Sequence, residues 1–439
     1  MIKLYEHQEQ ALEKMRENKA FALFMDMGTG KTLPTLWHLT ELYLDDKIKD
    51  ALVVCPKHVI GSWERDFKLI EQVFDINPEE FVTVTNYAQL TSKNSKKYMR
   101  KWGAVILDES HYIKTRTSQR TKASLELAMV AEYRYILTGT PISNGQLENI
   151  FSQLAFLHPV RRYGRIQPKI WKTWTEFTEK YCYLDQWFTP YAYHHVDELQ
   201  DIINQHSFRV TKEDALDLPK VLPDIIWDIP KANVRIYDEM AKESTNLERE
   251  ILAENSLTRM SKLRQISSGF IYDEFETHKL KTHKISTLRD YLRNTDDPVV
   301  IFYEFSESFI QIKEMLEREK VKFEYLNASQ KNNQAWQDFQ NDRTIRVFLA
   351  QYQSGSVGID LFKADTMIFY EPTLSANIMQ QARDRINRIG QTKKVRYIHM
   401  LTIGTIEKEI YRRVANYTDF SDKLFEEYIY NYRKGQKVK

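Results

Sequence analysis

The fold of this chain is decided by the stretch Met25-Asp26-Met27-Gly28-Thr29-Gly30-Lys31-Thr32. The apolar run 20–24 before it is typical of a short buried strand, and the apolar spacing of 33–44 predicts a helix. A glycine turn at such a junction directs backbone N–H groups toward phosphate oxygens, and the helix N-terminus adds its positive dipole end. We therefore predict a phosphate-binding loop in which Gly28, Thr29 and Gly30 surround the phosphates, Lys31 reaches the β- and γ-phosphates, and the Thr32 hydroxyl binds Mg²⁺.

The composition is that of a globular protein with room for two or three domains. The chain has 439 residues, with 63 Lys plus Arg against 61 Asp plus Glu, so any nucleic-acid surface must be a local patch. The two cysteines, Cys55 and Cys182, show no metal-ligand spacing and fit a reducing compartment. No apolar run is long enough to span a bilayer and no signal region is visible. We expect a cytoplasmic or nucleoid-associated protein without a membrane partner, acting as a monomer.

Short apolar runs alternate with helical patterns in two parts of the chain, which predicts an α/β fold with two tandem parallel-sheet lobes. We expect an N-terminal lobe at 1–215 that includes an aromatic and basic insert at 158–215, a linker and helical protrusion at 216–295, and a C-terminal lobe at 296–439. The expected strands are 21–25, 51–55, 81–85, 104–107 and 133–138 in the first lobe, and 298–303, 346–350, 366–370 and 396–401 in the second.

Two further strand ends in the first lobe carry chemistry. The apolar run 105–107 ends in Asp108 and Glu109, a pair suited to holding Mg²⁺ through water and to orienting or deprotonating the attacking water. The strand-to-turn junction 137–144 carries the hydroxyls of Thr138 and Thr140, which would bond the acidic pair and report the γ-phosphate to a neighbour. Taken alone, each of these segments is also compatible with an ordinary polar turn.

In the second lobe, residues 380–391 are expected to form a helix that carries several arginines. Arg385 and Arg388 are three residues apart, so they would share one helix face. Without an acidic partner nearby, two such guanidiniums favour an anion, and the proposed anion is the γ-phosphate held by the first lobe. A solvated basic face is the alternative for such a run.

These motifs together resemble those of the Swi/Snf-type family among the superfamily-two helicase-like ATPases, and the resemblance extends over nearly the whole chain. The most specific matches are Arg388-Ile389-Gly390-Gln391 and Gly404-Thr405-Ile406-Glu407-Lys408. The other matching stretches are 4–8, 25–32, 52–57, 84–87, 108–111, 113–120, 137–144 and 354–361. The spacing around the aromatic insert also resembles that of the annealing-helicase branch. One departure is 371–377, Glu-Pro-Thr-Leu-Ser-Ala-Asn, where family members usually carry Trp-Asn-Pro.

The resemblance implies two RecA-like lobes, ATP and Mg²⁺ as cofactors, and roles for individual residues. Lys31, Glu109, Arg385 and Arg388 would be catalytic, and Asp108 would join Thr32 at the metal. Gln8 would read adenine, while Gly358 and Asp360 would contact the nucleotide from the second lobe. Coupling would involve His111, Thr138, Thr140 and Gln381. The nucleic-acid contacts implied are Lys57, Lys114, Arg116 and Arg120 in the first lobe, with Ser354 and Gly355 in the second.

The resemblance implies an ATP-dependent translocase on double-stranded or branched DNA, acting in remodelling, replication, recombination or repair. A strand-separating DNA or RNA helicase is the first alternative, and an ATP-controlled DNA-binding module without motor activity is the second. The cluster Trp171, Trp174, Tyr181, Tyr183 and Trp187 in the insert is compatible with base stacking and with a small hydrophobic core.

Overall fold

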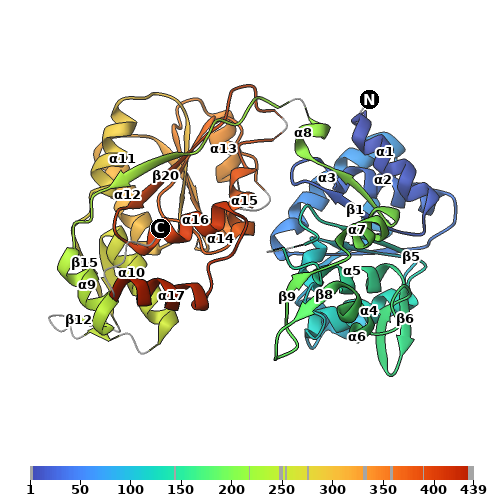
Figure 1. The fold of residues 1–439 in the computed structure, drawn as a ribbon. Helices are drawn as coiled ribbons and strands as arrows, with labels where there is room; N and C mark the ends of the chain where they lie inside the picture. The colour runs from blue at the N-terminus through green and yellow to red at the C-terminus, as the bar shows by residue number, and fades with distance from the viewer. Residues whose placement is uncertain are drawn as a thin grey trace. The chain divides into compact units, whose positions relative to one another are not determined.

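The chain forms two compact units, 1–217 and 218–439, and each unit is built on its own six-stranded parallel sheet (Figure 1). This computed structural model describes residues 3–142, 145–216, 218–246, 251–252, 255–273, 276–329, 334–355, 359–388 and 390–433. Within these ranges, no helix combines the length and the apolar character needed to cross a bilayer. The predicted α/β fold with two parallel-sheet lobes is confirmed.

The first unit has the strand order β10-β1-β5-β4-β2-β3, all parallel. The strands are β1 (Ala20–Met25), β2 (Ala51–Cys55), β3 (Val82–Asn86), β4 (Ala104–Asp108), β5 (Tyr133–Leu137) and β10 (Ser207–Val210). The helices are α1 (Glu6–Glu17), α2 (Thr32–Leu44), α3 (Ile60–Phe74), α4 (Gln119–Val130), α5 (Asn149–Leu157), α6 (Trp174–Tyr181), α7 (Val196–Gln205) and α8 (Lys212–Ala215). Two antiparallel hairpins pair β6 (Pro159–Arg162) with β7 (Arg165–Pro168) and β8 (Cys182–Leu184) with β9 (Pro190–Tyr193).

The apolar runs form strands because both sheet faces are covered. Along β4, Ala104 and Ile106 pack into one core cluster while Val105 and Leu107 pack into another. A strand buried on both faces reads as a continuous apolar run, which is why the sequence pattern identified it. The parallel strands also bring the ends of β1, β5 and β4 to one edge of the sheet, and that edge carries the candidate site.

The insert 158–215 is partly a structural extension of the first unit. Its β10 pairs with β1 at the edge of the sheet, a strand that the sequence pattern did not reveal. Trp171 and Tyr181 lie in the hydrophobic core, whereas Tyr183 is 52% exposed and Trp187 is 75% exposed. The aromatic cluster therefore divides into a buried core part and exposed rings.

The second unit has the order β11-β20-β19-β16-β18-β17, also parallel throughout. The strands are β11 (Ile225–Ile229), β16 (Val299–Tyr303), β17 (Phe323–Leu326), β18 (Val347–Gln351), β19 (Thr366–Phe369) and β20 (Arg396–Thr402). The helices are α9 (Val234–Glu243), α10 (Ser256–Ser268), α11 (Lys284–Arg293), α12 (Ser306–Arg318), α13 (Ala335–Asn341), α14 (Tyr352–Gly355), α15 (Ala376–Arg383), α16 (Ile406–Ala415) and α17 (Asp422–Arg433). Short hairpins pair β12 (Thr245–Asn246) with β13 (Ile251–Leu252) and β14 (Phe270–Tyr272) with β15 (Thr277–Lys279).

The segment 216–295 differs from the expected linker and helical protrusion. Its β11 pairs with β20 and is the edge strand of the second sheet. Tyr237 and Leu263, on α9 and α10, are fully buried in a core cluster of that unit, and Leu288 on α11 is buried in another. Because its apolar side chains complete these cores, most of this segment is part of the second unit.

Candidate functional site

The phosphate-loop stretch lies at the carboxyl end of β1, where the chain turns into α2. Gly28 and Gly30 have φ angles of 83° and 75°, in the left-handed region that glycine adopts without steric cost. Lys31 is 9% exposed, and its Nζ donates to the carbonyl oxygens of Met25 at 2.8 Å and Asp26 at 3.2 Å. Thr32 is the first residue of α2. The loop therefore combines a buried ammonium with the N-terminus of the helix that the sequence predicted.

Helix α1 holds the phosphate loop from its other side. The Gln8 Nε2 donates to the Gly30 carbonyl at 3.0 Å, while its Oε1 accepts from the Tyr5 N–H at 3.0 Å. The His7 Nε2 lies 2.8 Å from the Thr29 carbonyl oxygen. A Cβ atom at Gly30 would lie 2.4 Å from the Gln8 Nε2, so a side chain there would displace the Gln8 amide from this bond. Gln8, the residue expected to read adenine, thus uses both ends of its amide within the protein.

Asp108 ends β4 as a buried carboxylate with two protein donors. The Trp63 Nε1–H donates to its Oδ2 at 2.9 Å, and the Glu109 N–H donates to its Oδ1 at 2.9 Å. Burial and the neighbouring Glu109 charge raise the pKa of Asp108 to about 6, although Trp63 and the positive charge of Lys31 oppose the shift. A carboxylate held in this way favours a cation that replaces its lost hydration.

Glu109 belongs to a compact polar group with His111 and Thr138. Its backbone is left-handed at φ 51°, and its Oε2 lies 3.3 Å from the His111 Nδ1. The Thr138 hydroxyl lies 3.5 Å from that carboxylate oxygen and 3.3 Å from the His111 Nδ1. The Thr138 hydroxyl also accepts from the Thr140 N–H at 3.1 Å. The structure thus brings together four residues predicted to take part in catalysis and coupling.

The turn after β5 packs against the phosphate loop. A Cβ atom at Gly139 would lie 3.1 Å from the Met27 nitrogen and 3.3 Å from the Met25 carbonyl oxygen. Strand β5 also separates β1 from β4 in the sheet, so this turn links the loop to the acidic pair. The Thr32 hydroxyl and the Asp108 carboxylate are hard oxygen donors of the kind that Mg²⁺ prefers, and this donor set fits that ion.

Two of the predicted nucleic-acid contacts, Lys57 and Arg120, line one cavity of about 500 Å³ in the first unit. Its walls also contain Asn86, Tyr87 and Tyr112. The rings of Tyr87 and Tyr112 are stacked at 5.2 Å, and the Arg120 guanidinium lies 5.5 Å from the centre of the Tyr112 ring. The Tyr87 hydroxyl donates to the Asp108 carbonyl oxygen at 2.9 Å, so a wall of this cavity is bonded to the nucleotide site.

The other two predicted contacts of the first unit lie elsewhere. Lys114 is half-buried and does not line either of the two large cavities of that unit in the described residues. Arg116 faces a second cavity, of about 880 Å³, together with Arg165 and Trp174. The segment 113–120 therefore supplies residues to two different surfaces.

The predicted arginine helix ends earlier than expected. Helix α15 ends at Arg383, so Arg385 and Arg388 lie in the turns that follow and share no helix face. Their guanidiniums converge nevertheless, since Arg385 donates to the Ile359 carbonyl oxygen at 3.2 Å and Arg388 donates to the same oxygen at 3.3 Å. Arg388 also forms an ion pair with Asp360, which corrects the expectation that no acid lies nearby.

The remaining residues predicted in the second unit occupy separate places. Gln381 lies on α15, and its carbonyl oxygen accepts from the Arg385 Nε at 2.9 Å. Ser354 and Gly355 end α14, where a Cβ atom at Gly355 would lie 2.4 Å from the Ala350 Cβ. Gly358 lies outside the described residues, as do Ser143 and Asn144 of the turn after β5.

Sequence reasoning missed the contributions of Trp63 and Gln153. Trp63 is fully buried on α3. A buried indole N–H needs a hydrogen-bond acceptor, and this need is the one signal that could have suggested a polar partner for Trp63. The Gln153 amide accepts from the Ser110 hydroxyl at 2.7 Å and donates to the Pro141 carbonyl at 2.7 Å. It thereby connects the acidic segment to the turn after β5. Nothing in the local pattern of α5 distinguishes this glutamine from a surface residue.

This chain is similar to known proteins over most of its length. The SNF2-related domain family matches residues 7–77 and 70–270, and the helicase conserved C-terminal domain matches 283–390. The ATP-dependent helicase fft1 of Schizosaccharomyces pombe is 24% identical over 89% of this chain and 49% of its own length. The DNA annealing helicase and endonuclease ZRANB3 of Mus musculus is 25% identical over 87% of this chain and 37% of its own length.

A solved structure, the SWI2/SNF2 ATPase core of Sulfolobus solfataricus in complex with dsDNA, is 23% identical to this chain. It aligns with a TM-score of 0.43 over 99% of this chain and 94% of that one. Two parallel α/β lobes that match these two domain models define a helicase-like class of protein. The chain belongs to the SNF2-related family. It spans less than half the length of the curated relatives named above.

Proposed function

We propose that this protein is an ATP-dependent translocase on double-stranded DNA that remodels DNA structures or protein–DNA complexes during replication, recombination or repair. ATP would bind at the loop of Lys31, with Mg²⁺ held by Thr32 and Asp108, and Glu109 would orient the attacking water. Phosphoryl transfer requires mainly such positioning and charge stabilisation. The family membership and the names of the relatives, which include DNA-binding helicases, support this proposal.

The observation that carries the proposal is the hydrogen bond from Tyr87 to Asp108. Tyr87 lines the cavity of Lys57 and Arg120, and its hydroxyl donates to the backbone of the residue proposed to hold Mg²⁺. A shift of the Tyr87 ring on nucleic-acid binding would therefore move the acidic pair. This is a direct physical route by which nucleic acid can control ATP hydrolysis.

We propose that the protein contacts DNA mainly through the backbone phosphates. Lys57 and Arg120 are exposed, and Lys114, Arg116 and the Ser354 and Gly355 amides complete the proposed contact set. Contacts to the backbone carry no sequence information, which suits a motor that must move along any sequence. In the second unit, Arg385 and Arg388 are proposed to stabilise the γ-phosphate during transfer, and Asp360 to position Arg388.

The testing experiment measures the ATPase rate against linear duplex, forked, four-way and single-stranded DNA, and against RNA. We expect duplex DNA to stimulate hydrolysis, and the enzyme to displace the third strand of a triplex without separating the duplex. Failure of duplex DNA to raise the rate would overturn the proposal. Stimulation by single strands with unwinding of forks would favour a helicase, and binding without triplex displacement would favour an ATP-controlled binding module.

Tyr87→Phe tests the proposed link itself. Removing one hydroxyl leaves the ring stack in place, and we expect the DNA-stimulated rate to fall by about fivefold while the DNA-free rate is retained. Tyr133→Phe is the matched control, because Tyr133 is also buried in the first unit but lies outside the cavity. Equal stimulation of the Tyr87→Phe and unchanged proteins would remove Tyr87 from the coupling route.

A further inference from the structure

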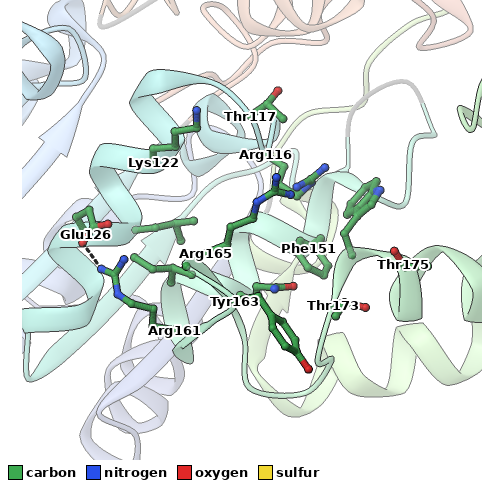
Figure 2. Close-up of a pocket in the computed structure, with 15 residues that line it drawn as sticks. Arg116, Thr117, Lys122, Glu126, Phe151, Arg161, Tyr163, Arg165, Thr173 and Thr175 are labelled. Atoms are coloured by element: carbon green, nitrogen blue, oxygen red, sulfur yellow. Dashed lines mark hydrogen bonds and ion pairs between the residues drawn. The ribbon is translucent and has the colours of Figure 1, made fainter.

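The first unit contains a second, larger cavity, of which the proposed function uses only Arg116. It has a volume of about 880 Å³, and its walls come from α4, α5, the β6–β7 hairpin and the start of α6 (Figure 2). It shares no lining residue with the cavity of Lys57 and Arg120. Its volume lies in the range of small-molecule sites, about 300–1,000 Å³, and is sufficient for a nucleotide.

The cavity is strongly basic. Figure 2 shows the side chains of Arg116 and Arg165 converging, and Lys122 also lines the wall. Within the described residues, neither Arg116 nor Arg165 forms an ion pair, and the acidic Glu126 is paired with Arg161 at 2.5 Å. Burial and the charge of Arg165 lower the pKa of Arg116, as expected for two guanidiniums that face each other without an anion.

An exposed tyrosine stands at the tip of the hairpin beside these charges. Arg162 pairs with Arg165, so Tyr163 and Gly164 form a two-residue turn, with φ angles of 51° and 71°. Such a turn favours Asn, Asp or Gly at its first position, because a left-handed backbone strains residues with bulky side chains. Tyr163 is nevertheless 88% exposed, so burial of its ring does not offset this strain. Strain of this kind is characteristic of functional positions.

A second aromatic ring makes this wall rigid. The Arg116 guanidinium lies 4.9 Å from the centre of the Trp174 ring, and Trp174 packs edge-to-face on the buried Phe151 at 5.1 Å. Arg116 is thus held at a fixed place on an aromatic surface. Converging guanidiniums and an exposed ring on the wall of one cavity match a ligand that has both a phosphate and a flat base.

We propose that this cavity binds an unpaired nucleotide, with its phosphate between Arg116 and Arg165 and its base stacked on Tyr163. Bases of every kind have a π face, so such a site tolerates any sequence. A single-stranded DNA segment and a free nucleotide both have the phosphate and the flat base that this site would bind. The site goes beyond duplex translocation, since it would retain the displaced or unpaired strand of a branched DNA.

The test measures the binding of a fluorescently labelled oligothymidylate to the full chain without ATP, by anisotropy. Tyr163→Asn removes the ring and introduces a residue that favours the left-handed turn, so its melting temperature should be equal or higher. We expect its affinity for the oligomer to fall by about tenfold. Tyr191→Asn is the matched control, because Tyr191 is 68% exposed on β9 of the same insert but does not line the cavity.

Arg165→Glu tests the phosphate contact, with Lys169→Glu as its control. Lys169 is an exposed cation of the same insert outside the cavity. We expect a loss of about tenfold or more for Arg165→Glu and little change for the control. Duplex-stimulated ATPase should persist in the Tyr163 and Arg165 variants, so failure of this site is distinguishable from failure of the proposed translocase function.

Further experiments locate the bound oligomer on the protein and identify the ligand. Photocrosslinking of an oligomer that contains 5-iodouracil should label Tyr163 or Trp174, and labelling confined to other segments would overturn the proposal. An abasic oligomer should bind equally to the unchanged and Tyr163→Asn proteins, because the ring contacts the base. Displacement of the oligomer by thymidine monophosphate at similar concentration would assign a free nucleotide, and displacement only by longer strands would assign single-stranded DNA.

Discussion

The two units hold their key cations in different ways. In the first unit, the Lys31 ammonium is bonded to two neutral carbonyl oxygens, those of Met25 and Asp26. In the second unit, Arg388 is paired with the carboxylate of Asp360 and donates to the Ile359 carbonyl. Both cations are therefore held within their own unit, but of the two only Arg388 forms an ion pair within the described residues.

The difference indicates how readily each cation can accept a phosphate. A neutral carbonyl gives up an ammonium at the cost of ordinary hydrogen bonds, whereas a carboxylate competes with the phosphate through its full charge. In the proposed function, Lys31 is therefore prepared for a phosphate before it arrives. Arg388 would have to exchange one anion for another, so its proposed contribution is tied to a rearrangement around Asp360.

The largest effect is expected from Arg388→Ala. If this guanidinium acts on the transferred phosphate, kcat for ATP should fall by about 10³–10⁵-fold, as for other arginine fingers. Lys394→Ala is the control, because Lys394 is an exposed cation of the same unit. A folded Arg388→Ala protein with normal ATPase activity would falsify the proposed role of Arg388. Of the two cations compared, only Lys31 would then keep a proposed role in hydrolysis.

Lys31→Ala should have the next largest effect. Loss of the ammonium would remove the charge proposed to neutralise the β- and γ-phosphates, and we expect turnover to fall by about 10²–10³-fold. The fold should remain intact by circular dichroism, because the partners of Lys31 are neutral carbonyls. Retained turnover would show that the loop positions ATP by its backbone alone.

Asp360→Asn separates the ion pair from the guanidinium itself. The variant keeps the Arg388 bond to Ile359 but removes the competing carboxylate, and we expect kcat to change by about tenfold or less. The pair is partly accessible, with each side chain 19% exposed. A loss as large as that of Arg388→Ala would assign Asp360 a direct contact with the nucleotide.

The smallest expected effect is a change in Trp63 fluorescence as Asp108, the buried acid of the first unit, ionises. Burial raises its pKa to about 6, so the carboxyl should remain protonated below that pH and ionise above it. The Trp63 indole that donates to it should report the change as a fluorescence difference between the unchanged and Trp63→Phe proteins in EDTA. Added Mg²⁺ should move the midpoint to lower pH, and a midpoint near 4 without metal would contradict this account.

Local sequence patterns were sufficient to predict the elements whose structure depends mainly on their own residues. The strands β1, β2, β4 and β16 follow the expected apolar runs closely, and the Gly-Lys-Thr turn falls at a strand end. The edge strands β10 and β11 were not recognised, because a charged residue, Arg209 or Asp228, interrupts the apolar residues of each strand. The helix expected through 391 ends at Arg383, since contacts with residues 359–360 hold the following turns.

The sequence by itself determined the parallel α/β architecture and the nucleotide loop, because apolar periodicity and glycine placement act over a few neighbouring residues. Only the tertiary structure decided the partners of the side chains at the candidate site. Asp108 meets Trp63, Tyr87 reaches the Asp108 backbone, and Arg388 meets Asp360 across intervals of 45, 21 and 28 residues, counted from their numbers. Such contacts depend on how separate elements pack, and no local pattern encodes them.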